Sequence, residues 1–325
     1  MISKIEKDFY QITLRMPYRL RHVNAYLFIY EGKLALFDTG LNTPQAFETL
    51  GNDLSGIGFG IEDIQHIYLT HVHSDHCSMA GVLQKRSGAQ IHLAQAAFEE
   101  YRHFREAGPT IKQLRIYYAR QGMSQEQIGL VIEEYENIRG IIADFDAADF
   151  LRDKDVREFG NWKIEIISTP GHAAGHVCFF CREMKFLLSG DHVLPYIAPV
   201  LSPDIFDEAF RPLAAYLDSL NALKNLCVTA VYPGHGISFV DLQERIADIR
   251  EHHSKRKTMV LDRVHAQPRT ARDISHETLA PTLSDFDKFL ALNETIAYLK
   301  ELTAEGAIKE DTLNDVLVYV RPSGY

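Results

Sequence analysis

The sequence has few cysteines and no long apolar segment. Only four cysteines occur in 325 residues, too few to suggest a disulfide scaffold: Cys77, Cys178, Cys181 and Cys227. The longest apolar runs fall far below the ~20 residues that cross a bilayer, and the first ten residues contain no apolar signal core. These absences predict a soluble, cytoplasmic protein that does not associate with membranes.

Positive charge is also scarce. The chain has 34 Lys and Arg against 44 Asp and Glu, a formal charge of -10, and no run of five or six like charges. A polyphosphate backbone is attracted to basic surfaces, so this balance disfavours nucleic acid as a partner without excluding it. We therefore expect a small-molecule substrate.

Two of the cysteines form a C-x-x-C spacing, which is typical of redox or metal sites. Cys178 and Cys181 lie in HVCFFC, a run that predicts a strand. Side chains three positions apart on a strand point to opposite faces, so this pair is not expected to bind a metal or form a disulfide.

Apolar periodicity divides the chain into strand-rich and helical regions. Strands are expected at 10–16, 22–30, 33–40, 64–70, 89–93, 155–172, 176–181, 185–191 and 228–236, with helices near 43–54, 77–87 and 207–224. Thr43 and Pro44 supply a cap and first turn for the helix at 43–54. Residues 94–148 instead have helical spacing with Gly and Pro breaks, which predicts a helical insertion.

The last eighty residues have a different pattern. Beyond about residue 245, three helical segments precede strand-like pieces at 306–310 and 315–322, with a turn expected at 311–314. This is the order of a winged helix. We therefore predict a catalytic domain at 1–245, which includes the insertion, and a small winged-helix-like domain at 246–325.

The segment THVHSDH at 70–76 places three histidines and an aspartate directly after a predicted strand. Residues two apart can point the same way, so His71 and His73 can hold one ion while Asp75 and His76 hold another. Imidazole and carboxylate suit zinc, manganese or iron. With 15 histidines in the chain, a polar loop with chance histidines is the alternative.

Three later loops of similar character weaken that alternative. His172, Asp191 and His235 each follow a strand-like run and lie beside glycine or another small residue. Seven candidate ligands can serve two ions, with Asp191 as a bridge. Such a pair can hold water as a bridging hydroxide near neutral pH.

The motif HxHxDH, followed by separate His, Asp and His loops, resembles the metallo-β-lactamase-fold hydrolases, such as hydroxyacylglutathione hydrolases and lactonases. The resemblance extends from VNAYLF and FDTG to YPGHG. It implies an α/β fold: an αββα sandwich of two mixed sheets lying face to face, with helices outside and the metals at one edge.

The resemblance also implies roles for individual residues. Two divalent ions are expected, zinc first, with iron or manganese as alternatives. Asp38 in FDTG resembles an aspartate that orients a ligand imidazole, although it can also be a turn-forming residue. Asp75 or Asp191 would take up or deliver a proton during hydrolysis. The implied ligands are His71, His73 and His172 on one ion, Asp75, His76 and His235 on the other, and Asp191 on both.

The C-terminal tail resembles the branch that contains β-lactamase-like protein 2, which is described as a single-strand RNA endonuclease. Charge argues against that activity, because the longest helix of the tail has more acids than bases and the only basic cluster is HHSKRK at 252–257. We interpret the tail as a packing module or the interface of a homodimer.

The leading hypothesis is a dinuclear metal hydrolase that acts on an ester-type bond, with a thioester such as an acyl-CoA ahead of a lactone. A metal-dependent single-strand RNA endonuclease and a mononuclear iron persulfide dioxygenase are the alternatives. The aromatic residues of the insertion either pack its helices together or roof a cleft for an acyl group: Phe98, Tyr101, Phe104, Tyr117 and Tyr118.

Three residues depart from the pattern of the family. Cys77 follows the histidine cluster where many relatives have glycine, and we interpret it as a small packing residue. His192 should turn away from Asp191, which favours a structural role. Tyr196, behind Pro195, does not match the tyrosine of the lactonases, so no role is carried over to it.

Overall fold

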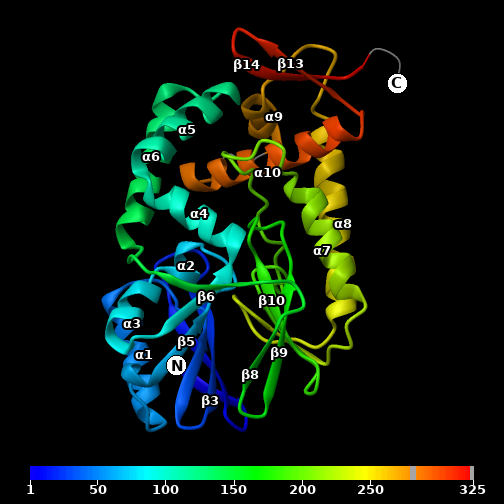
Figure 1. Ribbon diagram of the computed structural model, residues 1–325. Coiled ribbons are helices and arrows are strands. Elements are labelled where there is room, and N and C mark those ends of the chain that lie inside the picture. The colour runs from blue at the N-terminus through cyan, green and yellow to red at the C-terminus, as the bar shows by residue number, and fades with distance from the viewer. Residues whose placement is uncertain (279–282, 323–325) are drawn as a thin grey trace.

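Two β-sheets lie face to face in the computed structural model, which describes residues 1–278 and 283–322 (Figure 1). The first is a mixed sheet whose strands lie in chain order: β1 (Ile2–Glu6), β2 (Phe9–Arg15), β3 (His22–Tyr30), β4 (Lys33–Phe37), β5 (Ile64–Tyr68), β6 (Gln90–Ala94) and β7 (Ala147–Leu151). The second has the order β12 (Ala230–Pro233), β11 (Phe186–Gly190), β10 (Val177–Cys181), β9 (Trp162–Ser168) and β8 (Val156–Phe159).

Aromatic side chains fill the space between the two sheets. Phe9 stacks on Phe186 with ring centroids 4.8 Å apart, and Phe37 meets Phe179 edge-on at 4.8 Å. Each pair joins one sheet to the other and contributes about 0.5–1.5 kcal/mol beyond its buried area. The predicted αββα sandwich is confirmed.

The alternation along β10 separates the two cysteines of the C-x-x-C spacing. Cys178 belongs to the cluster under the outer helices, whereas Cys181 faces the core between the sheets. All four cysteines are free. The interpretation of this spacing as an ordinary strand feature is therefore confirmed.

Helices cover the outer face of each sheet. The side chain of Thr43 accepts a hydrogen bond from the N–H of Ala46 at 3.1 Å, and Pro44 begins the helix as predicted. The covering elements are α1 (Pro44–Gly56), η1 (Ile61–Asp63), α2 (Ser74–Cys77) and α3 (Ala80–Ser87) at the first sheet, and α7 (Pro212–Lys224) and α8 (Leu242–Leu261) at the second. The helix expected near 77–87 is present as α3, which begins at Ala80, and the short helix α2 precedes it.

The predicted insertion is helical, as expected, and forms α4 (Gln95–Arg105), α5 (Ala107–Arg120) and α6 (Gln125–Ile141). Its last residues return to the first sheet as β7, parallel to β6. This strand was not predicted, because its partner lies more than fifty residues earlier. A contact of His92 with Asp149 helps to join the two strands.

The aromatic residues of the insertion pack into hydrophobic clusters. Tyr101, Tyr117 and Tyr118 are 3–6 % exposed, and Phe104 packs against the same clusters. The hydroxyl of Tyr118 also donates to Asn293 Oδ1 at 2.8 Å. These side chains fasten the insertion to the rest of the chain, so the packing alternative describes them.

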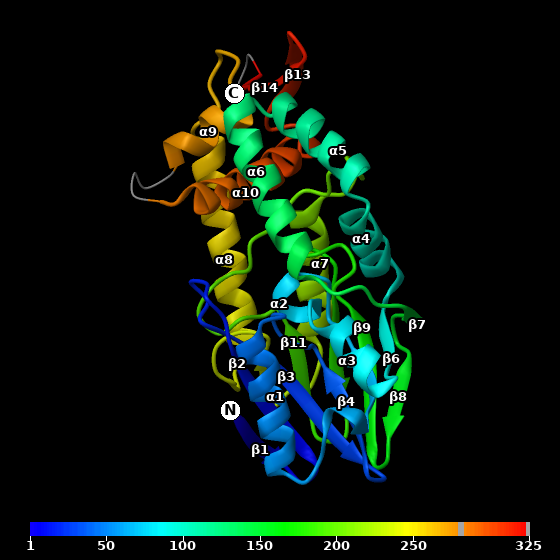
Figure 2. The same cartoon turned by 90° about the vertical axis from the view of Figure 1, so that its left-hand side faces the viewer.

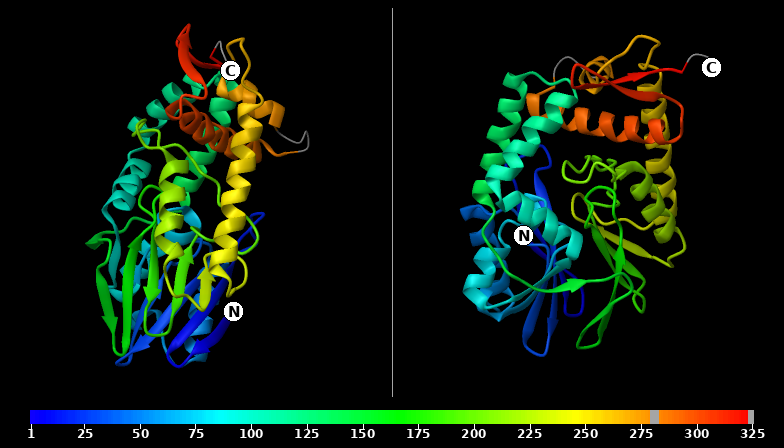
Figure 3. Two further views of the ribbon diagram at one scale, coloured as in Figure 1. Left: turned by 90° about the vertical axis from the view of Figure 1, so that its right-hand side faces the viewer. Right: turned by 45° about the horizontal axis from the view of Figure 1, so that its top comes forward.

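The C-terminal region contains α9 (Ala271–Thr278), α10 (Asp285–Ala304), β13 (Lys309–Leu313) and β14 (Val316–Val320). Figure 3 shows α10 crossing the top of the molecule between the insertion helices and α8. Side chains of α5, α6, α8 and α10 share one hydrophobic cluster, and α8 runs through the predicted boundary at residue 245. The division into domains 1–245 and 246–325 stays a prediction.

The C-terminal hairpin turns at Asn314 and Asp315, not at 311–314. Both residues have positive φ, 51° and 64°, which is typical of a two-residue hairpin turn that continues the twist of the strands. Among the described residues, no helix is long and apolar enough to cross a membrane.

Candidate functional site

The predicted ligands lie where strands end at one edge of the sandwich. His71, His73, Asp75 and His76 follow β5, and Asp191 directly follows β11. His172 and His235 lie in the loops after β9 and β12. Loops at the carboxyl ends of strands commonly form the binding crevice of α/β folds.

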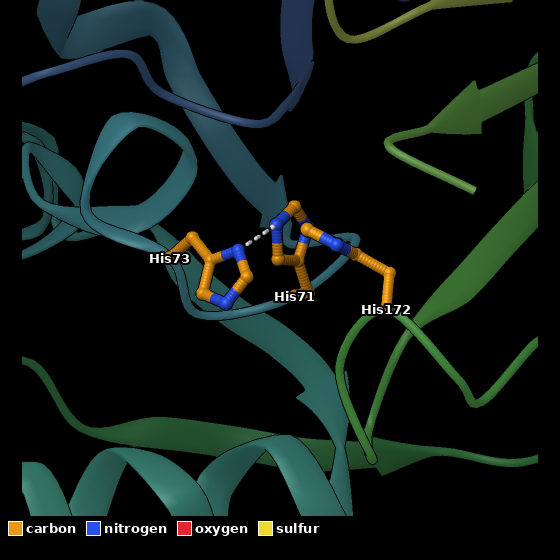
Figure 4. Close-up of side chains that lie close together, drawn as sticks. All are labelled: His71, His73 and His172. Atoms are coloured by element: carbon orange, nitrogen blue, oxygen red, sulfur yellow. Dashed lines mark hydrogen bonds between the residues drawn. The ribbon is translucent and has the colours of Figure 1, made fainter. Parts of the chain in front are cut away.

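Three histidines form the first cluster. The ligand nitrogens of His71, His73 and His172 lie within 4.8 Å of one another, as the close approach of the three rings in Figure 4 illustrates. His71 Nε2 is 3.0 Å from His73 Nδ1. Burial lowers the pKa of all three groups, that of His73 to about 3. The rings are therefore neutral, the form in which imidazole binds metals.

Asp75, His76 and His235 form the second cluster. Their ligand atoms also lie within 4.8 Å of one another, and His235 Nε2 is 3.2 Å from Asp75 Oδ2. Burial alone would lower the pKa of His76 and His235, but the neighbouring carboxylates, Asp191 and Asp75 above all, together outweigh it and raise the pKa of His235 to about 10. A metal entering this cluster would displace protons.

Asp191 lies between the two clusters. Its Oδ1 is 3.3 Å from His76 Nε2, while its Oδ2 is 3.3 Å from His235 Nε2 and 3.8 Å from His172 Nε2. Burial would raise the pKa of Asp191, but the charges of His235 and His76 hold it well below its usual value. One carboxylate thus approaches ligand atoms of both clusters.

Several buried ligand atoms have no hydrogen-bond partner among the described residues: His76 Nε2, His172 Nε2, Asp191 Oδ1 and His235 Nε2. His76, His235 and Asp191 lie near opposite charges, but none of these four atoms makes a well-directed hydrogen bond, and a buried polar atom left so costs about 1–3 kcal/mol. Imidazole nitrogens and carboxylate oxygens are suitable donors for a divalent cation such as zinc. The residues therefore fit the metal ions that the sequence predicts.

Asp38, at the end of β4, contacts the back of the second cluster. Its Oδ2 accepts a hydrogen bond from His76 Nδ1 at 2.8 Å, and its Oδ1 accepts one from the N–H of Thr70 at 2.8 Å. The first bond leaves His76 Nε2 facing the cluster. Asp38 also has a φ of 57°, so it combines this contact with a turn conformation.

Asn24 and Tyr26 position the His235 loop, a role that was not predicted for either residue. Asn24 Nδ2 donates to the carbonyls of Pro233 and Gly236 at 3.1 and 2.9 Å, and the Tyr26 hydroxyl donates to Pro233 at 2.7 Å. Asn24 is 1 % exposed. The sequence contained one sign of this role: Asn24 is a polar residue within the apolar run HVNAYLFIY, and an asparagine that is buried in such a strand needs specific hydrogen-bond partners.

The residues that depart from the family pattern lie beside the clusters. Cys77 is fully buried at the end of α2, and burial raises its thiol pKa well above the usual value, which does not favour a thiolate ligand. The ring of His192 lies 4.7 Å from that of Tyr216, consistent with a structural role. Tyr196 is 70 % exposed.

The model of one protein family, described as the Metallo-beta-lactamase superfamily, matches residues 18–235. The chain belongs to the metallo-beta-lactamase superfamily. Members of this superfamily are metal-dependent hydrolases, so the protein is a metal-binding hydrolase. All the predicted ligands and Asp38 lie within the matched residues.

Two of the relatives with similar sequences match most of this superfamily member, and a third matches less than a third of it. The probable metallo-hydrolase YqjP of Bacillus subtilis is 27 % identical over 93 % of this chain and 94 % of its own. A beta-lactamase-like protein 2 homolog of Caenorhabditis elegans is 24 % identical over 90 % of this chain and 82 % of its own. The atrochrysone carboxyl ACP thioesterase of Aspergillus chevalieri is 30 % identical over 30 % of this chain and 29 % of its own.

One solved structure is similar to this chain over almost its full length. A metallo-beta-lactamase family protein from Thermus thermophilus is 28 % identical, with a TM-score of 0.87, over 98 % of this chain and 100 % of its own. The insertion and the C-terminal region thus belong to an architecture that this chain shares with the Thermus protein.

Proposed function

We propose that the two clusters hold two divalent metal ions, zinc first, and that the protein uses them to hydrolyse an ester-type bond. The observation that supports this proposal is the position of Asp191 within 4 Å of ligand atoms from both clusters. The proposed ligands are His71, His73 and His172 for one ion, Asp75, His76 and His235 for the other, and Asp191 for both.

Bound divalent ions would supply Lewis acidity toward a carbonyl oxygen and lower the pKa of water. Asp75 is the better placed of the two carboxylates to move a proton, because its side chain is 19 % exposed against 9 % for Asp191. Its Oδ2 faces His235, which leaves Oδ1 to accept the proton of the attacking water. In thioester hydrolysis the C–S bond breaks, the acyl carbon gains the hydroxyl of water, and the thiolate gains the proton.

A thioester is the substrate class that we place ahead of a lactone. The similarity of part of the chain to a protein named as an acyl-carrier thioesterase supports this order. An acyl-CoA contains the same thioester bond in a small molecule, so we propose it as the substrate.

The charge distribution argues against RNA as the substrate. The basic run at 252–257 is the strongest candidate for a phosphate-binding surface, but its cations are paired with nearby acids, which reduces their attraction for phosphate. The pairs are Lys255 with Glu251 at 2.6 Å, Arg256 with Glu294 at 3.1 Å, and Lys257 with Glu305 at 2.6 Å.

Metal analysis and a substrate panel test the proposal. We expect about two divalent ions per chain, and hydrolysis that is lost on chelation and restored by added zinc. The panel comprises an acyl-CoA, a lactone, bis-p-nitrophenyl phosphate and a single-stranded RNA oligonucleotide, each assayed with wild-type protein and Asp75→Ala. His92→Ala is the control, because His92 lies outside both clusters.

Three results would contradict the proposal. Cleavage of RNA alone, lost in Asp75→Ala, would identify a nuclease. About one iron per chain with sulfite production from a persulfide would identify a dioxygenase. Gently purified protein with fewer than about one ion per chain, whose hydrolysis is not restored by metal, would exclude metal catalysis.

A further inference from the structure

A pocket of about 300 Å³ lies between α6 of the insertion and α9 and α10 of the C-terminal region. This volume is at the lower end of the range of about 300–1,000 Å³ for small-molecule sites. Its apolar lining consists of Met123, Leu130, Val131, Phe286, Phe289 and Leu292. Figure 2 shows α6 and α10 above α2, the helix that carries Asp75 and His76.

The loop at 16–21, between β2 and β3, connects the metal-ligand clusters with this pocket. At its end, the carbonyl of His22 accepts a hydrogen bond from His235 Nδ1 at 2.7 Å. Near its tip, Arg19 Nη1 lies 3.9 Å from Asp287 Oδ1. Asp287 does not itself line the pocket but lies between two residues that do, Phe286 and Lys288, so the loop and its end have one contact with the His235 loop and one beside the pocket.

Tyr18 belongs to the same loop, between the residue that approaches Asp287 and strand β2. Burial, and then the charges of Glu134 and Asp75, raise the pKa of its hydroxyl. Glu134 lines the pocket, so the charges of the pocket wall and of the cluster both act on this ring. Tyr18 is 44 % exposed.

The chemistry of the pocket favours an apolar ligand without charge. Leu130 and Phe286 are each 46 % exposed, an arrangement typical of a binding surface. The cations of the lining are already paired with acids, since Lys288 contacts Asp285 at 2.8 Å and Arg272 contacts Asp273 at 3.5 Å. The lining also contains three acids, Glu133, Glu134 and Asp285, which repel an anion. The pocket therefore suits a hydrocarbon chain better than a phosphate or a carboxylate.

We propose that the pocket between α6, α9 and α10 binds the medium-length acyl chain of the substrate, while the carbonyl to be hydrolysed lies at the metal-ligand clusters. This inference rests on the proposed function for the reaction itself. It adds that the residues lining the pocket select the length of the acyl chain.

The test compares octanoyl-CoA with acetyl-CoA in the metal-loaded protein. Leu130→Trp should fill the pocket and lower kcat/KM for octanoyl-CoA by at least about tenfold, since one methylene in an apolar pocket changes discrimination by roughly 10–200-fold. The value for acetyl-CoA should be unchanged. Phe286→Ser is a second variant. It removes an apolar contact of the pocket and should lower kcat/KM for octanoyl-CoA but not for acetyl-CoA.

Ile116→Trp is the matched control. Ile116 is also 46 % exposed on a helix of the insertion, but it does not line the pocket. Both substrates should be hydrolysed at wild-type rates by this variant. Unchanged melting temperatures would show that each variant is folded.

Calorimetric binding of 1-octanol, which carries no charge, separates this inference from the proposed function. If wild-type protein hydrolyses both thioesters and Leu130→Trp affects both equally or neither, the pocket assignment is overturned and the proposed function stands. If no thioester is hydrolysed but 1-octanol binds and Leu130→Trp abolishes binding, the proposed function fails and the apolar site stands. Absence of 1-octanol binding to wild-type protein would overturn the inference.

Discussion

Replacing Asp38 by asparagine should weaken one of the two proposed metal sites and spare the other. Asp38 has a φ of 57°, and asparagine tolerates this left-handed conformation well, so the backbone should be retained. The new amide oxygen can still accept the hydrogen bond from Thr70. Its NH₂ group would then face the N–H of His76 across 2.8 Å, where the aspartate accepted that proton.

The size of the effect follows from the imidazole tautomer. To relieve the contact between two donors, His76 must move its proton to Nε2, which removes the lone pair that faces the cluster. Loss of such an orienting partner costs about 10–100-fold in metal affinity, or roughly 1.4–2.7 kcal/mol. We expect this loss at the site of Asp75, His76 and His235 and little change at the site of His71, His73 and His172.

Competition between metal-stripped protein and a chromophoric zinc chelator measures both affinities. Asp149→Asn is the control, because Asp149 contacts His92 outside both clusters. It should bind zinc like the wild type. Unchanged affinities in Asp38→Asn, or an equal loss at both sites, would refute the argument from the tautomer.

Three predictions concern stability, each measured by urea unfolding. Tyr118→Phe leaves the Asn293 side chain without its buried donor and should cost about 1–3 kcal/mol. Gly175→Ala would press a methyl group against the backbone of α4 and should cost about 1–3 kcal/mol. Burial, then the charge of Asp204, raises the pKa of Glu100 from 4.5 to about 7, so the unfolded state ionises first and stability falls as pH rises through this window. Glu100→Gln should remove the fall and add about 1–3 kcal/mol at pH 8. Wild-type values for the two substitutions at buried contacts, or an unchanged pH profile for Glu100→Gln, would contradict these expectations.

The sequence by itself determined the strands and the loops that carry the predicted ligands, and its resemblance to the metallo-β-lactamase fold implied the sandwich. Strand periodicity is local, and each of these loops follows a strand, so His71, His172, Asp191 and His235 could be recognised as candidates without knowing the distances between them. The same local signals predicted the cap at Thr43 and the opposite faces of the two β10 cysteines.

Tertiary structure decided what surrounds those ligands. The brace from Asn24 to the His235 loop joins residues more than two hundred positions apart, and β7 pairs with a strand from before the insertion. The insertion aromatics could pack or line a cleft, and only their contacts distinguished these outcomes. The pocket likewise requires α6 to meet α9 and α10. Such features depend on long-range packing, which local periodicity does not encode.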